Sequence, residues 1–198
     1  MSEREGLLPG YRVREVSREG FDALRERWME VLYPQALAAR ATAYLEGAPR
    51  PGWGASQRRR QLVVETDDAE GAFVAWAVGR QSGPHAWRMN NTAVMPEHRR
   101  RGIYSALCER VCAWAREEGF AVVESRHQPT NNAILIAKLK LGFHVAGLEL
   151  SVDWGTLVQL ERPLTDAYRE LLAYRCGASA LSRELADAAG LRPIRDSS

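Results

Sequence analysis

The stretch VMPEHRRRGIYSALCERV, residues 94 to 111, decides the fold of this chain. A strand ends before its proline, three arginines lead to Gly102, and an amphipathic helix starts at once. Such a turn aims several backbone N–H groups and the positive end of a helix dipole at one point, where an anion can bind. Gly102 lets the backbone approach a ligand without a Cβ in the way. The alternative is an exposed basic turn that caps the helix and binds nothing.

Strands and helices follow on either side of this turn. Strand patterns fall at about residues 11–16, 62–66, 72–79, 87–95, 121–125, 144–152 and 156–161. Two helical patterns begin directly after the capping residues Ser17 and Thr165. Further helical patterns cover about residues 35–45, 103–118, 132–141 and, more weakly, 179–189. This order predicts an α/β (α+β) fold, with one mixed, mostly antiparallel sheet and helices on both of its faces.

The composition is that of a globular protein, with 45% hydrophobic and 26% charged residues in a chain of 198. A chain of this length needs neither disulfides nor a structural metal to hold a core. Its cysteines, Cys108, Cys112 and Cys176, are odd in number and lack zinc-ligand spacing, so we expect free thiols and no metal. The polar N-terminus is not signal-like, and no apolar run reaches the roughly 20 residues that span a bilayer. We therefore expect a cytoplasmic protein that does not bind a membrane.

Arginine dominates the basic residues, because only Lys138 and Lys140 of the 27 are lysines. The planar guanidinium binds phosphate in a fork-like geometry, and two runs compete for that role, Arg58–Arg60 and Arg99–Arg101. The formal net charge is only +2, and acidic residues are spread throughout. This balance argues against a nucleic-acid partner.

A second informative stretch follows the first by about thirty residues, and together they carry a resemblance. RRRGIY, from Arg99 to Tyr104, resembles the R/Q-x-x-G-x-G/A phosphate loop of the GNAT superfamily of acetyl-CoA-dependent N-acetyltransferases. The spacing of Asn131, Lys138 and Gly142-Phe143 is similar to that superfamily's N…Y…GF signature. The resemblance covers about residues 11–162. It implies a GNAT-like domain over 1–162 with a C-terminal helical extension over 163–198.

The resemblance implies where acetyl-CoA binds. The strand that ends in Thr92, Ala93 and Val94 should splay from the next strand of the sheet and hydrogen-bond the pantetheine arm, with the Val94 N–H directed at the thioester carbonyl. Asn131 should bind the pantetheine or orient the slot. The backbone N–H groups that should hold the pyrophosphate belong to Arg99, Arg100, Arg101, Gly102, Ile103, Tyr104 and Ser105.

Two positions depart from the family's pattern. Tyr104 stands where a small residue is usual, and it fits if its side chain points away from the pyrophosphate. Lys138 stands where many members carry the tyrosine that protonates the departing thiolate of CoA. A lysine there could supply that proton or stabilise the thiolate, because it lies about two turns after Asn131 on the same helical face. The alternative is a lysine that faces the solvent.

The base that would accept a proton from the amine is also missing from the expected strand, because residues 87–92 contain no carboxylate. His127 and Glu124 are the nearest candidates by topology, and imidazole has a suitable ordinary pKa. The alternatives are a structural role for His127 and a deprotonation relayed by solvent without a dedicated base.

The resemblance predicts an enzyme that transfers acetyl from acetyl-CoA to a primary amine by direct attack. A cysteine intermediate is disfavoured, because Cys108 and Cys112 lie inside a helix. The alternative is a non-catalytic module that binds or senses acyl-CoA.

For the enzyme, the resemblance implies an acceptor amine that is a small molecule or a peptide. Trp53 could line the acceptor pocket. Arg58–Arg60 could favour an acidic acceptor or be a solvated charge run. The C-terminal helices could pack on the core or form a homodimer contact.

Overall fold

The computed structural model describes residues 5–33, 58–151, 154–188 and 190. The predicted helix over 35–45, and the Gly/Pro-rich loop that contains Trp53, lie outside the described residues.

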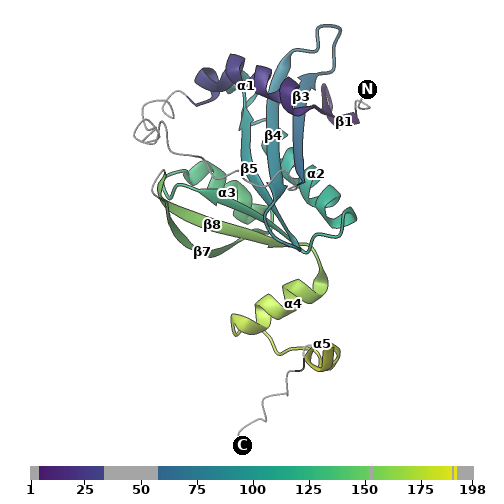
Figure 1. The fold of residues 1–198 in the computed structure, drawn as a ribbon, viewed down its shortest axis with the longest axis vertical. Helices are drawn as coiled ribbons and strands as arrows, with labels where there is room; N and C mark the ends of the chain where they lie inside the picture. Colours follow the sequence, from purple (N-terminus) through teal and green to yellow (C-terminus); the bar gives the residue numbers. More distant parts are fainter. Residues whose placement is uncertain (1–4, 34–57, 152–153, 189, 191–198) are drawn as a thin grey trace, which may run out of the picture.

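Eight strands form one sheet in the order β1-β2-β3-β4-β5-β6-β8-β7 (Figure 1). They are β1 (Glu5–Leu8), β2 (Tyr11–Glu15), β3 (Arg59–Thr66), β4 (Phe73–Gln81), β5 (Ala86–Val94), β6 (Val122–His127), β7 (His144–Ser151) and β8 (Gly155–Pro163). Every neighbouring pair is antiparallel except β5 with β6, which is parallel. The prediction of a mixed, mostly antiparallel sheet is therefore confirmed. Strand β1 was not predicted, because four residues are too few for a strand pattern to stand out.

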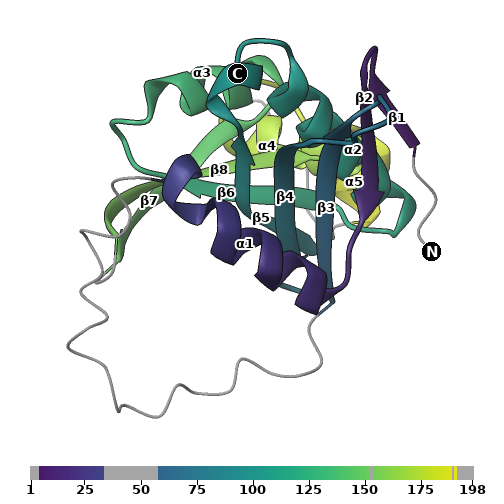
Figure 2. The same ribbon diagram turned by 90° about the horizontal axis from the view of Figure 1, so that it is seen from above.

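Helix α1 (Arg18–Leu32) covers one face of the sheet (Figure 2). It begins at Ser17, whose Oγ accepts a hydrogen bond from the Gly20 N–H at 3.1 Å and so satisfies one free donor of the first turn. Its buried residue Phe21 packs edge to face on Trp76 of β4, with 5.3 Å between ring centroids. We call this face of the sheet the α1 side.

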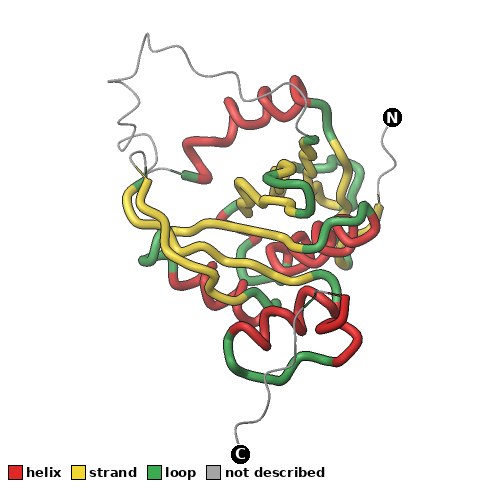
Figure 3. Tube along the Cα trace, turned by 60° about the horizontal axis from the view of Figure 1, so that its bottom comes forward, coloured by secondary structure: helices red, strands yellow, loops and turns green. Residues whose placement is uncertain are grey.

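Helices α2 (Ile103–Glu117) and α3 (Asn132–Lys140) lie on the opposite face, which we call the α2 side (Figure 2). The larger apolar core lies there, with Ile103 and Leu107 of α2 packed beside Trp87 of β5. The indole of Trp87 meets that of Trp114 edge to face, with 4.6 Å between ring centroids. The strands form a layer between helices, as Figure 3 shows, so the prediction of helices on both faces is confirmed.

Two helices follow the sheet, α4 (Asp166–Arg175) and α5 (Arg183–Ala188), and they lie beyond its end (Figure 1). Thr165 caps α4, since its Oγ1 accepts from the Tyr168 N–H at 3.2 Å. The chain before α4 is tied to α2 by a 2.9 Å hydrogen bond from Arg116 Nε to the Leu164 carbonyl. A separate extension over 163–198 stays a prediction. No helix among the described residues is long and apolar enough to cross a membrane.

Candidate active site

Strands β5 and β6 separate partway along their length. Their parallel register runs from Ala86 opposite Val122 to Met89 opposite Ser125 and then stops. Beyond that point β5 continues to pair with β4, as far as Val94, and β6 continues to pair with β8. The two central strands therefore diverge as the family resemblance implies. We call the region between Thr92–Val94 of β5 and Ser125–His127 of β6 the slot.

A β-bulge in β5 sets which side chains face each side of the slot. On β4, Gly79 is opposite Met89 and Val78 is opposite Asn91, so Asn90 is the extra residue. Asn91 consequently faces the α1 side, where its Oδ1 accepts hydrogen bonds from Trp76 Nε1 at 2.6 Å and Tyr33 Oη at 3.0 Å.

Thr92 turns to the α2 side, because it is paired with Ala77, which belongs to the core beneath α2. Gly79 permits the close approach of strands at the bulge. A Cβ there would lie 2.5 Å from Trp87 Nε1 and 2.8 Å from the Arg88 carbonyl oxygen.

Three buried polar atoms flank the slot without a hydrogen-bond partner in the described part of the chain. They are Thr92 Oγ1, Ser125 Oγ and His127 Nε2. Ser125 and His127 alternate along β6 with Val123, which is in the core beneath α2, so these atoms share the α2 side with Thr92. Buried polar atoms are rarely left unpaired. Their presence on both strands fits a polar, extended ligand in the slot.

The turn before α2 presents its backbone as the sequence predicts. Gly102 is the N-terminal cap residue of α2, with φ of 81°, and Arg100 is also left-handed, with φ of 61°. No side chain caps the helix. The N–H groups of Ile103, Tyr104 and Ser105 are in its first turn, where intrahelical acceptors do not reach. With the exposed Gly102 they place backbone donors at the positive end of the α2 dipole, an arrangement that suits an anion.

The side chains of the arginine run serve this turn in different ways. Arg99 Nε donates to the Val94 carbonyl at 3.0 Å and so joins the turn to the end of β5. Arg101 Nη1 donates to Tyr11 Oη at 3.1 Å. Tyr104 points inward instead and packs against the core, and its burial, together with Cys108 beside it, raises the pKa of its phenol.

Lys138 is wholly buried, with none of its surface exposed. Its Nζ donates to Met89 Sδ at 3.1 Å and lies 4.0 Å from the centroid of the Phe143 ring. Burial lowers the pKa of this amine, and the neighbouring Cys108 thiol offsets only part of that shift. The alternative of a solvent-facing lysine is therefore wrong. The amine points into the core beside the point where β5 and β6 separate.

His127 lies on the same side of the sheet, and its imidazole is neutral at physiological pH. Burial, and secondly the charge of Lys138, lower the pKa of His127 to about 4. A residue with that pKa accepts protons only transiently and is not a resting proton donor. Cys108 and Cys112 are free and buried, and burial raises the pKa of both thiols, to about 11 for Cys112. Neither is an activated nucleophile.

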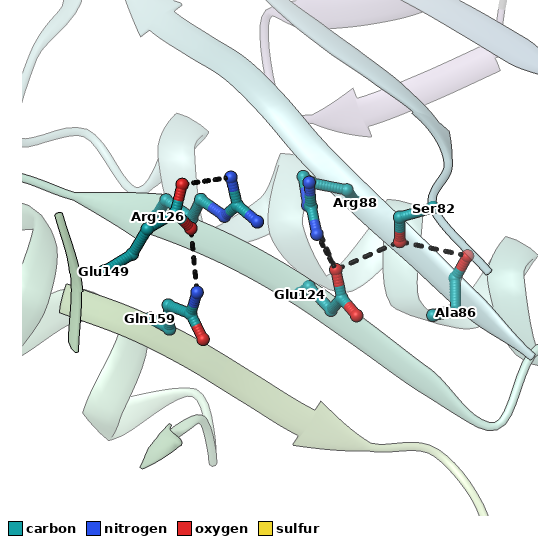
Figure 4. A network of polar contacts seen from close by, with 7 residues as sticks. All are labelled: Ser82, Ala86, Arg88, Glu124, Arg126, Glu149 and Gln159. Carbon is teal, nitrogen blue, oxygen red and sulfur yellow. Dashed lines mark hydrogen bonds and ion pairs between the residues drawn. The ribbon is translucent and has the colours of Figure 1, made fainter. Parts of the chain in front are cut away.

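Glu124 lies on the opposite, α1 side of the sheet. Its Oε2 accepts hydrogen bonds from Arg88 Nε at 3.0 Å, Arg88 Nη2 at 2.7 Å and Ser82 Oγ at 3.0 Å (Figure 4). This carboxylate is thus committed to an ion pair. Of the two base candidates, only His127 lies on the α2 side, together with the unpaired atoms of Thr92 and Ser125.

The remaining predicted residues lie at the margins. Asn131 is exposed at the start of α3 and makes no capping hydrogen bond with its side chain. The run Arg58–Arg60 is not one patch. Arg58 pairs with Glu118, while Arg60 pairs with Glu15 at 3.0 Å and lies over a tryptophan ring. Sequence reasoning missed Asn91 and Ser125, although the four consecutive polar residues 124–127 place polar groups on both faces of a strand.

Comparison with known families gives one match. The model described as the acetyltransferase (GNAT) family matches residues 20–143, which include β3 to β6, the arginine turn and both helices of the α2 side. No curated protein matches the sequence.

Solved structures with the same fold include two that are named as acetyltransferases, and the protein Ard1. Nourseothricin acetyltransferase is 19% identical with a TM-score of 0.55, and the match covers 79% of this chain and 99% of that one. Ard1 from Thermoplasma volcanium is 20% identical with a TM-score of 0.57, over 79% and 99%. The ribosomal-protein-S18-alanine N-acetyltransferase from Escherichia coli is 18% identical with a TM-score of 0.52, over 78% and 94%. At such identities the likeness concerns the fold alone.

Proposed function

Since the chain belongs to the GNAT acetyltransferase family, we propose that it transfers the acetyl group of acetyl-CoA directly to a primary amine of a small molecule or a peptide. Membership makes the protein an acyltransferase. The observation that carries the finer proposal is the set of unpaired atoms on Thr92, Ser125 and His127 at the slot. A pantetheine arm, with its amides and hydroxyl, offers the hydrogen bonds that these atoms lack.

Different residues of this chain bind different parts of acetyl-CoA. The backbone N–H groups of residues 99–105 hold the pyrophosphate, and Gly102 keeps the approach open. Thr92, Ala93 and Val94 hydrogen-bond the arm along the edge of β5 that β6 has left, and Asn131 closes the far side. The Val94 N–H polarises the thioester carbonyl. When bound, acetyl-CoA supplies the activated acetyl group.

Solvent and the neutral His127 carry the protons of the reaction. Solvent takes the proton of the arriving ammonium, as no carboxylate on β5 is available. As the amine nitrogen forms its bond to the acetyl carbon and the carbon–sulfur bond breaks, nitrogen loses a second proton and sulfur gains one. His127 receives that proton and returns it to the thiolate. Lys138 is assigned as a positioning residue, whose amine holds Met89 and depresses the pKa of His127.

Thiol release tests this function. We expect free CoA to appear when the protein, acetyl-CoA and a suitable primary amine are mixed, and we expect His127→Gln to lower kcat. A pH profile distinguishes a proton-transfer role from a structural one, because the variant should lose the acid limb that His127 contributes. Calorimetric binding of CoA without thiol release across a broad amine panel would instead indicate a module that only binds acyl-CoA.

A further inference from the structure

Helix α1 crosses the strands on the α1 side of the sheet, and it ends beside the slot (Figure 2). Its C-terminal cap residue is Tyr33, whose N–H donates to the Met29 carbonyl at 2.9 Å. The ring of Tyr33 packs against the smaller apolar core between α1 and the sheet, which includes Trp76. Its Oη lies 3.0 Å from Asn91 Oδ1 and 3.5 Å from the Thr92 carbonyl oxygen. The acetyl transfer proposed above leaves this phenol without a role.

The hydrogen bonding of β5 directs the Thr92 carbonyl into the slot. The Met95 N–H, at the end of the strand, donates to the Val74 carbonyl of β4 at 2.9 Å. Backbone groups of consecutive residues face alternate edges of a strand, so those of Val94 and Thr92 face the edge that β6 has left. The Thr92 carbonyl is therefore the neighbour, on this edge, of the Val94 N–H that the proposed function directs at the thioester.

Trp76 determines where the proton of the Tyr33 phenol points. An indole N–H can only donate, so the Asn91 atom that Trp76 Nε1 meets at 2.6 Å is the carboxamide oxygen. Tyr33 must therefore donate its single proton to bind that same oxygen at 3.0 Å. The 3.5 Å contact with the Thr92 carbonyl is longer than an ordinary O–H···O hydrogen bond. Tyr33 Oη thus keeps its lone pairs beside a second accepting oxygen.

We call Tyr33 Oη and the Thr92 carbonyl oxygen the oxygen pair. Burial raises the pKa of the phenol to about 12, so the phenol stays protonated at physiological pH and its proton stays with Asn91. Two accepting oxygens without a proton between them suit an N–H donor. A group without a hydrogen, such as a carboxylate, would be repelled by both oxygens. The chemistry of the oxygen pair is therefore that of an amine site.

Acetyl-CoA and the amine reach the slot from different sides. The unpaired atoms of Thr92, Ser125 and His127, to which the proposed function assigns the pantetheine arm, lie on the α2 side. The oxygen pair lies where the slot meets the α1 side, since Asn91 and the end of α1 are there. An amine must approach the thioester carbonyl from a direction that the pantetheine arm leaves open, and this direction leads past the oxygen pair.

We propose that the oxygen pair accepts a hydrogen bond from the acceptor amine, and that Tyr33 is a specificity-determining residue that favours a primary amine over its N-methylated form. This inference rests on the proposed acetyl transfer at the same slot. After solvent has taken the ammonium proton, a primary amine has two hydrogens on nitrogen. The oxygen pair holds one, His127 receives the other, and the lone pair is left for the thioester carbonyl. An N-methylated amine has one hydrogen, so either the oxygen pair or His127 lacks its partner.

Matched amines test the proposal, because the members of each pair differ only in one N-methyl group. The pairs are tyramine with N-methyltyramine, benzylamine with N-methylbenzylamine, and a peptide with N-terminal alanine with its N-methylalanine form. Wherever the primary member releases thiol, we expect its kcat/KM to exceed that of the N-methylated member by about tenfold or more. Equal values, or a preference for the N-methylated member, would overturn the proposal.

Tyr33→Phe locates the preference, because it removes only the hydroxyl and keeps the ring in the apolar core. We expect kcat/KM for the primary amine to fall about tenfold, and the value for its N-methylated partner and the CoA affinity to change less than about twofold. Tyr168→Phe, on α4 with Tyr168 exposed, is the matched control and should change none of these. A merely structural phenol would affect both amines alike, so an unchanged ratio between them in Tyr33→Phe would contradict the assignment.

A binding measurement separates this inference from the proposed function. Should no amine release thiol, the proposed transfer fails, and calorimetric titration of the CoA-saturated protein with the same amine pairs then decides the inference. Binding of a primary member that Tyr33→Phe weakens and Tyr168→Phe does not would support an amine site at the oxygen pair. No binding of any primary member, or binding unchanged in Tyr33→Phe, would refute it.

Discussion

Acidification should destabilise this protein through His127, the half-buried imidazole at the slot. The pKa of this group falls from the ordinary 6.5 to about 4 in the folded chain, first because of burial and secondly because of Lys138. Between those two values the unfolded chain binds a proton that the folded chain does not. The stabilising contribution of the neutral imidazole is therefore present above the unfolded value and is lost as pH falls toward the folded one.

The magnitude follows from the size of the shift. A difference of about 2.5 pKa values, at about 1.4 kcal/mol each, corresponds to a loss of up to about 3 kcal/mol of unfolding free energy. The partial exposure of the ring makes this an upper bound. For a domain of this size, that loss is a large fraction of the total stability.

Urea unfolding at about pH 7 and about pH 4.5 measures the effect, with the wild type compared to His127→Gln. The glutamine keeps a polar side chain and cannot titrate, so the variant should lose less stability on acidification than the wild type. His85→Gln is the matched control, because His85 is exposed on the turn before β5, and it should follow the wild type. Equal losses in the wild type and His127→Gln would refute the placement of a neutral imidazole beside Lys138.

Three further substitutions test the turn before α2, the buried Lys138 and the β-bulge. Gly102→Glu should weaken CoA binding by about 100-fold or more in calorimetry, because it sets a carboxylate against the anion site, while the fold survives a φ of 81° at a cost of about 1 kcal/mol. An unchanged CoA affinity would show that the turn does not bind CoA. Lys138→Met should raise the free energy of unfolding by about 1–3 kcal/mol, since it replaces a buried amine with an apolar side chain of similar length, and it should lower kcat more than acetyl-CoA affinity. Lower stability in urea unfolding would contradict the first expectation, and an unchanged kcat the second. Gly79→Ala should destabilise by about 2–3 kcal/mol, because its Cβ would meet Trp87 and the backbone at the bulge, whereas Gly6→Ala, with nothing within 4 Å, should not. Equal thermal melting temperatures for these two would count against the bulge.

Local signals made most of the fold predictable. Ser17 and Thr165 cap helices where the sequence places them, and Gly102 begins α2 at the predicted residue. These features depend on a few neighbouring residues and on backbone geometry. The burial of Lys138 was not predictable in this way, because the apolar residues of α3 are not gathered on one face of the helix. Two of its large apolar residues, Ile136 and Leu139, are 54% and 48% exposed. Periodicity cannot choose the packed face of such a helix, and only tertiary contacts do.

The single extra residue at Asn90 determines which polar side chains of β5 face each side of the sheet. Without the bulge, strict alternation would place Asn91 on the α2 side with Met89 and turn Thr92 toward α1. The bulge reverses both, so Thr92 joins Ser125 and His127 on the α2 side, while Asn91 anchors α1 through Trp76. Strand β6 has no bulge, and its ordinary alternation keeps His127 facing one side and Arg126 the other. The unpaired polar atoms of β5 and β6 therefore lie together on the α2 side, opposite the face that α1 covers.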